Sequence, residues 1–274
     1  MADTKKKKSG ARPISDYSAV IGERRPFATA EAHKRLRTNV MFSFAEEAGC
    51  RVIGVTSAMA HEGKTTTSIN LAYDLMRAKQ KVLLIDADMR MSNIVRILDV
   101  NKSPGLSNLL IGGEESVNCI QSSSKLGGLP VISCGFIPPN PSELLSSQRM
   151  VAAIEKLKTM YDYIVIDLPP IAAVSDALIV SKLTDGIVVV VRQEFADKRL
   201  MDDAIRQLQF HEANIIGFVM NCTHVENKYY GKYGKYGKYK KYAKYSRYGY
   251  GYGYYNRRPE EPEVKPDEES GEKE

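Results

Sequence analysis

The sequence has no long hydrophobic run. Its longest aliphatic stretch, residues 187–191, is far shorter than the roughly 20 residues that a helix needs to cross a bilayer. The basic residues 5–8 have no apolar stretch behind them, so a secretory signal does not fit. We therefore expect a cytoplasmic chain that reaches a membrane only through a partner or through a basic surface.

The sequence also lacks paired cysteines. Cys50, Cys119, Cys134 and Cys222 are far apart and form no C-x-x-C pair. This spacing argues against a disulfide scaffold or a zinc site and favours a reducing compartment. The four thiols are expected to be structural.

Charge is distributed unevenly along the 274 residues, whose net charge is +6. Residues 228–258 carry ten basic side chains and no acidic one, whereas residues 259–274 carry a net charge of −6. These differences predict four parts. They are a basic flexible arm (1–28), one folded domain (29–227), a tail rich in Tyr, Lys and Gly (228–258) and an acidic disordered tail (259–274).

Short aliphatic runs alternate with helical patterns through the folded domain. The runs are typical of strands buried on both faces of a parallel sheet, and the intervening segments are long enough to be crossover helices. We predict an α/β fold of the P-loop NTPase type, with a doubly wound, mostly parallel sheet, helices on both faces and ligands at the strands' C-terminal ends. The expected strands are 52–56, 82–86, 129–133, 163–167, 187–192 and 215–221, and the expected helices include 65–79, 148–160 and 197–210.

One further helix is predicted before the first strand. Ala32, Leu36, Val40 and Phe44 recur at helical spacing, with charged side chains between them. This pattern predicts an amphipathic helix with a strongly charged exposed face.

The segment Ala58-Met-Ala-His-Glu-Gly63-Lys64-Thr65 follows a predicted strand and opens a predicted helix, the setting of a phosphate-binding loop. Backbone N–H groups would surround the phosphates of a nucleotide, Lys64 would neutralise the β and γ oxygens, and the Thr65 hydroxyl would ligate Mg²⁺. Ala58 occupies the position that usually holds the first glycine. The expected nucleotide contacts are Ala60, His61, Glu62, Gly63, Lys64, Thr65 and Thr66, of which His61 and Glu62 are expected to shape the loop.

Three aspartates follow two of the predicted strands. Asp86 and Asp88 come at the end of one strand, and Asp167 ends another strand before two prolines. Carboxylates at this depth are costly without a cation, so we expect either Mg²⁺ or Arg90 as the partner of Asp86 and Asp88. A helix cap or a salt bridge is the alternative. Asp167 is expected to orient a metal-bound water and to hold Mg²⁺ indirectly.

The basic tail contains closely spaced tyrosines, and Lys or Arg precedes seven of them directly. One interpretation is a phosphoacceptor cluster, in which each phosphate adds about −1.5 to −2 charges and about five to seven would cancel the basic charge. The other is a binding segment for nucleic acid or an anionic surface, with lysines on phosphates and tyrosines stacked on bases. An ATP site in the same chain favours the first. The candidate acceptors are Tyr229, Tyr230, Tyr233, Tyr236, Tyr239, Tyr242, Tyr245, Tyr248, Tyr250, Tyr252, Tyr254 and Tyr255.

Together these motifs resemble those of the bacterial tyrosine kinases that control capsule and exopolysaccharide synthesis. The resemblance covers roughly residues 29–255 and includes Walker A (58–65), Walker A′ (85–90), Walker B (166–170) and the tyrosine cluster. It implies an ATP- and Mg²⁺-dependent protein-tyrosine kinase that autophosphorylates its tail in trans. The implied catalytic residues are Lys64, Asp86, Asp88 and Asp167, with Asp86 as the base for the tyrosine hydroxyl, and the implied metal-binding residues are Thr65, Asp88 and Asp167.

The resemblance also implies partners. Family members form rings through a helix with the pattern Glu-x-x-Arg-x-x-Arg, matched here by Glu31, Lys34 and Arg37. A separate transmembrane adaptor would hold the kinase at the inner face of the cell membrane, and a cognate tyrosine phosphatase and other protein substrates are expected. No nucleic acid partner is expected.

Two rival interpretations share the phosphate loop. A positioning ATPase of the chromosome-partitioning or septum-placement type would have the same fold, but such proteins usually carry an additional lysine early in the loop, and residues 57–63 contain none. A nucleotide-gated module would use the Lys/Tyr tail to bind nucleic acid, and its salt-dependent binding would survive loss of Lys64.

Overall fold

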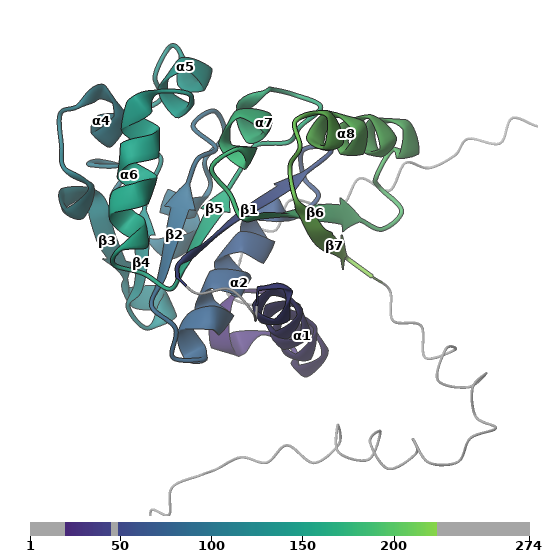
Figure 1. The fold of residues 1–274 in the computed structure, drawn as a ribbon. Helices are drawn as coiled ribbons and strands as arrows, with labels where there is room; N and C mark the ends of the chain where they lie inside the picture. Colours follow the sequence, from purple (N-terminus) through teal and green to yellow (C-terminus); the bar gives the residue numbers. More distant parts are fainter. Residues whose placement is uncertain (1–19, 45–48, 224–274) are drawn as a thin grey trace, which may run out of the picture. The chain divides into compact units, whose positions relative to one another are not determined.

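The computed structural model describes residues 20–44 and 49–223, which contain one seven-stranded sheet (Figure 1). The strand order is β3-β4-β2-β5-β1-β6-β7, and every neighbouring pair is parallel except β3 with β4. The predicted, mostly parallel sheet is confirmed. The strands are β1 (Arg51–Ser57), β2 (Val82–Asp86), β3 (Ile120–Ser123), β4 (Leu129–Ile132), β5 (Tyr163–Asp167), β6 (Gly186–Arg192) and β7 (Ile215–Asn221).

The two edges of the sheet differ from the expectation. Strand β3 was not predicted, because its sequence Ile-Gln-Ser-Ser has neither an aliphatic run nor clear alternation. Strand β7 was predicted to be buried on both faces, and this was wrong: Phe218 is 54% exposed and Met220 is 58% exposed. Among the strands of the described residues, β7 is the last in the sheet and pairs with β6 alone.

Helices cover both faces of the sheet (Figure 1). Apolar side chains of α1, α2 and α3 pack into one cluster with alternate strand residues such as Ile53 and Leu84. Those of α4 to α8 pack into the other cluster, with strand neighbours such as Val52 and Leu83. The helices are α1 (Phe27–Ser43), α2 (Lys64–Arg77), α3 (Ile94–Leu98), α4 (Leu106–Ile111), α5 (Pro141–Leu145), α6 (Gln148–Lys158), α7 (Asp176–Ser181) and α8 (Lys198–Phe210).

The segment before α1 lies against α2. Arg25 forms a bidentate pair with Asp74, its Nη2 and Nη1 lying 2.6 and 3.0 Å from Oδ1 and Oδ2. Asn70 accepts from the Gly22 N–H and donates to the Val20 carbonyl. The structure therefore places residues 20–25, assigned to the arm from sequence, against the folded domain. The sequence did not indicate this, because their partners lie about fifty positions away and leave no local pattern.

Helix α1 forms where it was predicted, but its apolar face is weaker than expected, because only its second half reaches the core. Val40 and the capping residue Phe44 are buried, whereas Ala32 is exposed. Among the described residues, no helix is long and apolar enough to cross a bilayer. Residues 1–19 of the basic arm and the two predicted tails (228–258 and 259–274) lie outside the described residues.

Candidate active site

The predicted phosphate loop connects β1 to α2, as its sequence indicated. The left-handed residues of the loop are His61 (φ 65°) and Gly63 (φ 97°). Ala58 is buried, and its carbonyl accepts from the Ala172 N–H at 3.0 Å. The conformation that most requires glycine therefore occurs at Gly63, and alanine fits at the first position of the motif.

The loop leads directly into the N-terminus of α2. Gly63 is the N-cap residue, and its carbonyl accepts from the Thr67 N–H at 3.0 Å. In an α-helix the first N–H groups have no partner within the helix, and their partial positive charge favours an anion. Residues 60–66 thus form one continuous loop and helix start suited to phosphate; their contacts with a nucleotide stay predictions.

The three predicted aspartates are brought together beside Lys64. Asp86 and Asp167 end the adjacent strands β2 and β5 and are register partners. All three carboxylates are buried, and the Lys64 Nζ lies 2.7 Å from Asp88 Oδ2. The sheet therefore brings side chains from three separate sequence motifs into one cluster.

Two serines that the sequence analysis did not single out contact these aspartates. The Ser68 hydroxyl donates to Asp167 Oδ1 at 2.9 Å, and the Ser92 hydroxyl donates to Asp86. Ser68 lies one turn after Lys64 on α2, so helical spacing from the lysine could have indicated it. Nothing local indicated Ser92.

The cluster contains more negative than positive charge. Burial, together with the charge of Asp167, raises the pKa of Asp86 well above its usual value. Burial also raises the pKa of Asp167, although Lys64 opposes the shift. Burial alone would lower the pKa of Lys64, but Asp167 and Asp88 outweigh it, and the pKa of the ammonium is raised. One lysine among three carboxylates leaves an acidic excess that a divalent cation would balance.

The described residues contain no group of three His, Cys, Asp or Glu side chains placed to hold a metal ion by themselves. Mg²⁺ is commonly held by one or two protein oxygens together with substrate phosphates and water. The Thr65 hydroxyl, Asp88 and Asp167 lie around the start of α2 and fit that role. Their assignment as metal-binding residues stays a prediction.

Arg90 does not bind Asp86 or Asp88, so this alternative was wrong. Its Nε lies 2.8 Å from Asp176 Oδ2, and its Nη2 lies 3.1 Å from the Ser142 hydroxyl. Asp176 is fully buried at the start of α7. Arg90 therefore ties the segment after β2 to α5 and α7, and no sequence signal indicated Asp176.

The predicted oligomer contacts lie on α1, which packs against α2. Lys34 Nζ lies 2.8 Å from Glu31 Oε1, and both side chains are largely exposed. Arg37 is half-buried, and its Nε has no hydrogen-bond partner among the described residues. A contact with another copy through these residues stays a prediction.

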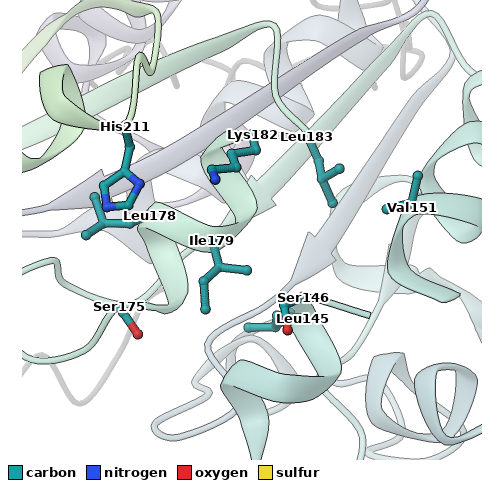
Figure 2. Close-up of a pocket in the computed structure, with 9 residues that line it drawn as sticks. All are labelled: Leu145, Ser146, Val151, Ser175, Leu178, Ile179, Lys182, Leu183 and His211. Carbon is teal, nitrogen blue, oxygen red and sulfur yellow. The ribbon is translucent and has the colours of Figure 1, made fainter. Parts of the chain in front are cut away.

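A hollow of about 350 Å³ lies away from this cluster (Figure 2). Leu178, Ile179, Lys182 and Leu183, from α7 and the residues after it, face Leu145 and neighbours from α5 and α6. None of the predicted site residues lines this hollow. The complete lining is Leu145, Ser146, Val151, Ser175, Leu178, Ile179, Lys182, Leu183 and His211.

Comparisons with known proteins show the family and the fold. A family model described as "AAA domain" matches residues 50–214. Tyrosine-protein kinase YwqD of Bacillus subtilis (strain 168) is 34% identical over 206 residues, which cover 74% of this chain and 86% of that protein. The solved kinase domain of Escherichia coli tyrosine kinase ETK is 34% identical, with a TM-score of 0.67 over 72% of this chain and 78% of that chain.

A solved structure with another activity shares the fold. It is the septum site-determining protein MinD from Pyrococcus horikoshii OT3, complexed with Mg-ADP, which is 23% identical with a TM-score of 0.54. The match covers 62% of this chain and 70% of that chain. At this identity the likeness supports the fold alone.

Proposed function

The chain belongs to the bacterial tyrosine-protein kinase family, and from that premise we propose that it transfers the γ-phosphoryl group of ATP to its own C-terminal tyrosine cluster in trans and thereby regulates capsular or extracellular polysaccharide synthesis and export. The observation that carries the proposal is the cluster of Lys64 with Asp86, Asp88 and Asp167 beside the phosphate loop. Phosphoryl transfer depends on positioning and on electrostatic stabilisation, and this cluster supplies groups for both.

Each residue of the cluster has a distinct part in the proposed reaction. The N-terminus of α2 and the Lys64 ammonium bind the phosphate oxygens. The raised pKa of Asp86 makes its carboxylate a stronger proton acceptor, suited to remove the proton of a tyrosine hydroxyl. Thr65, Asp88 and Asp167 would hold Mg²⁺. The bound ion would neutralise charge on the nucleotide phosphates.

The acceptor segment is proposed from its chemistry. Residues 228–258 carry a charge of +10, and a basic residue precedes seven of the tyrosines. A basic tail is attracted to a site with excess carboxylate and phosphate charge. Transfer between copies is proposed within a ring that uses Glu31, Lys34 and Arg37 of α1, on the strength of the family resemblance.

The cellular setting is part of the same proposal. A transmembrane adaptor in a separate chain would bring the kinase to the inner face of the cell membrane and complete its ATP site. A tyrosine phosphatase would reverse the modification, and further protein substrates are expected. These partners follow from the family resemblance, which extends over both the nucleotide motifs and the tyrosine cluster.

The test is incubation of the purified full-length protein with Mg-ATP, followed by mapping of phosphotyrosine by mass spectrometry. We expect phosphate on residues 229–255 in the wild type and none in Lys64→Met, because the lysine that binds the phosphates is lost. Lys79→Met, a change of an exposed lysine just after α2, is the matched control and should keep full activity.

The opposite outcome would point to another function. If the wild type hydrolyses ATP but places no phosphate on the tail, even with an adaptor peptide present, the chain is better described as a positioning ATPase with the fold of MinD. Salt-dependent nucleic acid binding that survives Lys64→Met would instead support the nucleotide-gated binding module.

A further inference from the structure

Glu62 is a fully buried acidic side chain in the middle of the phosphate loop. Its Oε2 accepts from the Met59 N–H at 2.8 Å, and its Oε1 accepts from the Arg192 N–H at 3.4 Å. One partner is thus in the loop itself, and the other is the last residue of β6. A buried carboxylate is retained only where hydrogen bonds compensate for the lost water, so these contacts define its position.

The backbone of the loop next to Glu62 is held by the same strand ends. Asn221, the last residue of β7, donates from Nδ2 to the Glu62 carbonyl at 2.9 Å. Arg192 donates from Nη1 to the His61 carbonyl at 3.2 Å. Arg192 and Asn221 are register partners on neighbouring strands. Contacts from two adjacent strand ends therefore converge on two consecutive loop residues.

The backbone conformation of the loop matches these contacts. His61 is held with φ at 65°, a left-handed conformation that is unfavourable for a residue with a side chain. A Cβ atom at Gly63 would lie 1.8 Å from Asn221 Nδ2, so the close approach of Asn221 requires glycine there. The loop is thus shaped by groups outside its own sequence.

These contacts lie on the opposite side of β1 from the aspartates. In the sheet order, β5 and β2 follow β1 in one direction, and β6 and β7 follow it in the other. The Lys64–Asp88 ion pair fixes the start of α2 toward β2, and Glu62 fixes the loop toward β6 and β7. The phosphate loop is therefore held from both sides.

We propose that Glu62 is a positioning residue that ties the phosphate loop to the ends of β6 and β7 and so keeps the N–H groups of the loop directed at the nucleotide phosphates. This role rests on the proposed function, because the loop geometry matters for catalysis only if ATP binds there. Glu62 itself does not touch the reacting atoms.

The chain contains a matched control at the opposite end of the same strands. Asp185, the residue before β6, accepts from the Val52 N–H at 2.7 Å through Oδ2, and its carbonyl accepts from Asn214 Nδ2 at 2.8 Å. Asn214 is the residue just before β7, and Asn221 is the last residue of β7. Asp185 and Glu62 thus have the same kinds of partner, but only Glu62 lies in the phosphate loop.

The test compares Glu62→Gln with Asp185→Asn in the full chain, using Mg-ADP as the probe in calorimetric titration. In each variant an amide NH₂ group replaces one acceptor oxygen, so both should melt at a somewhat lower temperature. We expect Glu62→Gln to weaken Mg-ADP binding by about tenfold and Asp185→Asn by less than about twofold. In kinase assays Glu62→Gln should raise KM for ATP while KM for a tail-tyrosine peptide stays unchanged.

Equal Mg-ADP affinity in the wild type and in folded Glu62→Gln would overturn the proposal, as would an equal loss in Asp185→Asn. If Glu62→Gln does not fold, Arg192→Met removes the contact to the His61 carbonyl, together with the packing of the guanidinium on the Phe195 ring outside the loop, and should weaken Mg-ADP binding by about threefold. An unchanged affinity in that variant also overturns it. ADP binding needs no phosphotransfer, so the comparison of Mg-ADP affinities tests the role of Glu62 even if the tail is not the phosphate acceptor. A wild-type protein that binds no Mg-ADP would overturn both the role of Glu62 and the proposed kinase function.

Discussion

At the scale of single residues, Asp86 is a side chain whose effect on stability differs from its expected effect on activity. Its carboxyl group is fully buried beside other acidic side chains. It accepts hydrogen bonds from the Ser92 hydroxyl and from the Asp88 N–H. Burial raises its pKa well above the usual value, which means that the charged form is unfavourable in the fold. A side chain that costs stability in this way is a candidate for a catalytic role.

Replacing Asp86 with Asn should therefore have opposite effects on activity and on stability. We expect kcat for tyrosine phosphorylation to fall by about 10²–10⁴-fold, because the general base is lost. The melting temperature should stay the same or rise, because a buried charge is removed. Kinetics with a tail peptide and thermal melting measure the two effects. A kcat within about tenfold of the wild type would exclude Asp86 as the base.

At the scale of secondary structure elements, α2 is the element on which the site depends. Its first turn carries Lys64 and Thr65, and its C-terminal half is covered by residues 20–25 through the Arg25–Asp74 pair. Both side chains of this pair are almost fully buried. The segment before α1 therefore supports α2 from the end opposite to the predicted phosphate loop.

Breaking that pair should destabilise the domain strongly. We expect Arg25→Met to lower the free energy of unfolding by about 3–5 kcal/mol, because Asp74 is left buried and unpaired. Arg77→Met, which removes the exposed pair with Glu23, is the control and should cost less than about 1 kcal/mol. Urea unfolding measures both changes. Similar losses in the two variants would show that burial of the Arg25–Asp74 pair does not matter.

At the scale of the whole molecule, the charge of the tail would influence whether copies of the chain stay together in the proposed ring. Residues 228–258 carry a charge of +10, and about five to seven phosphates would cancel it. Phosphorylated tails would lose their attraction to acidic surfaces and, as negative charge accumulates, would repel one another. Autophosphorylation is therefore expected to favour dissociation of the proposed ring.

Sedimentation velocity tests this expectation. We expect the protein purified with a phosphatase to sediment as an oligomer and the heavily phosphorylated protein to sediment as smaller species. Lys64→Met after the same incubation with Mg-ATP is the control, because it should remain assembled. An identical sedimentation coefficient for both phosphorylation states would refute the coupling of charge to assembly.

Much of the fold and of the candidate site could be predicted from the sequence because the signals are local. Central strands such as β2 and β5 appear as short aliphatic runs, and the phosphate loop appears as a fixed spacing of Gly63, Lys64 and Thr65 between a strand and a helix. The aspartates were found because Asp86 and Asp167 each end such a run and Asp88 follows two residues after Asp86. In a parallel sheet, strand ends meet at one edge, so position along the chain already determines proximity.

The tertiary structure decided which side chains become partners. Lys64 pairs with Asp88, Arg90 pairs with Asp176 and Arg25 pairs with Asp74, although nothing in the local sequence indicates which acid each basic residue would bind. Glu62 likewise finds its partners at the ends of β6 and β7. The physical reason is that hydrogen bonds and ion pairs act over a few ångströms. Residues distant in sequence come that close only when the sheet and its helices are packed.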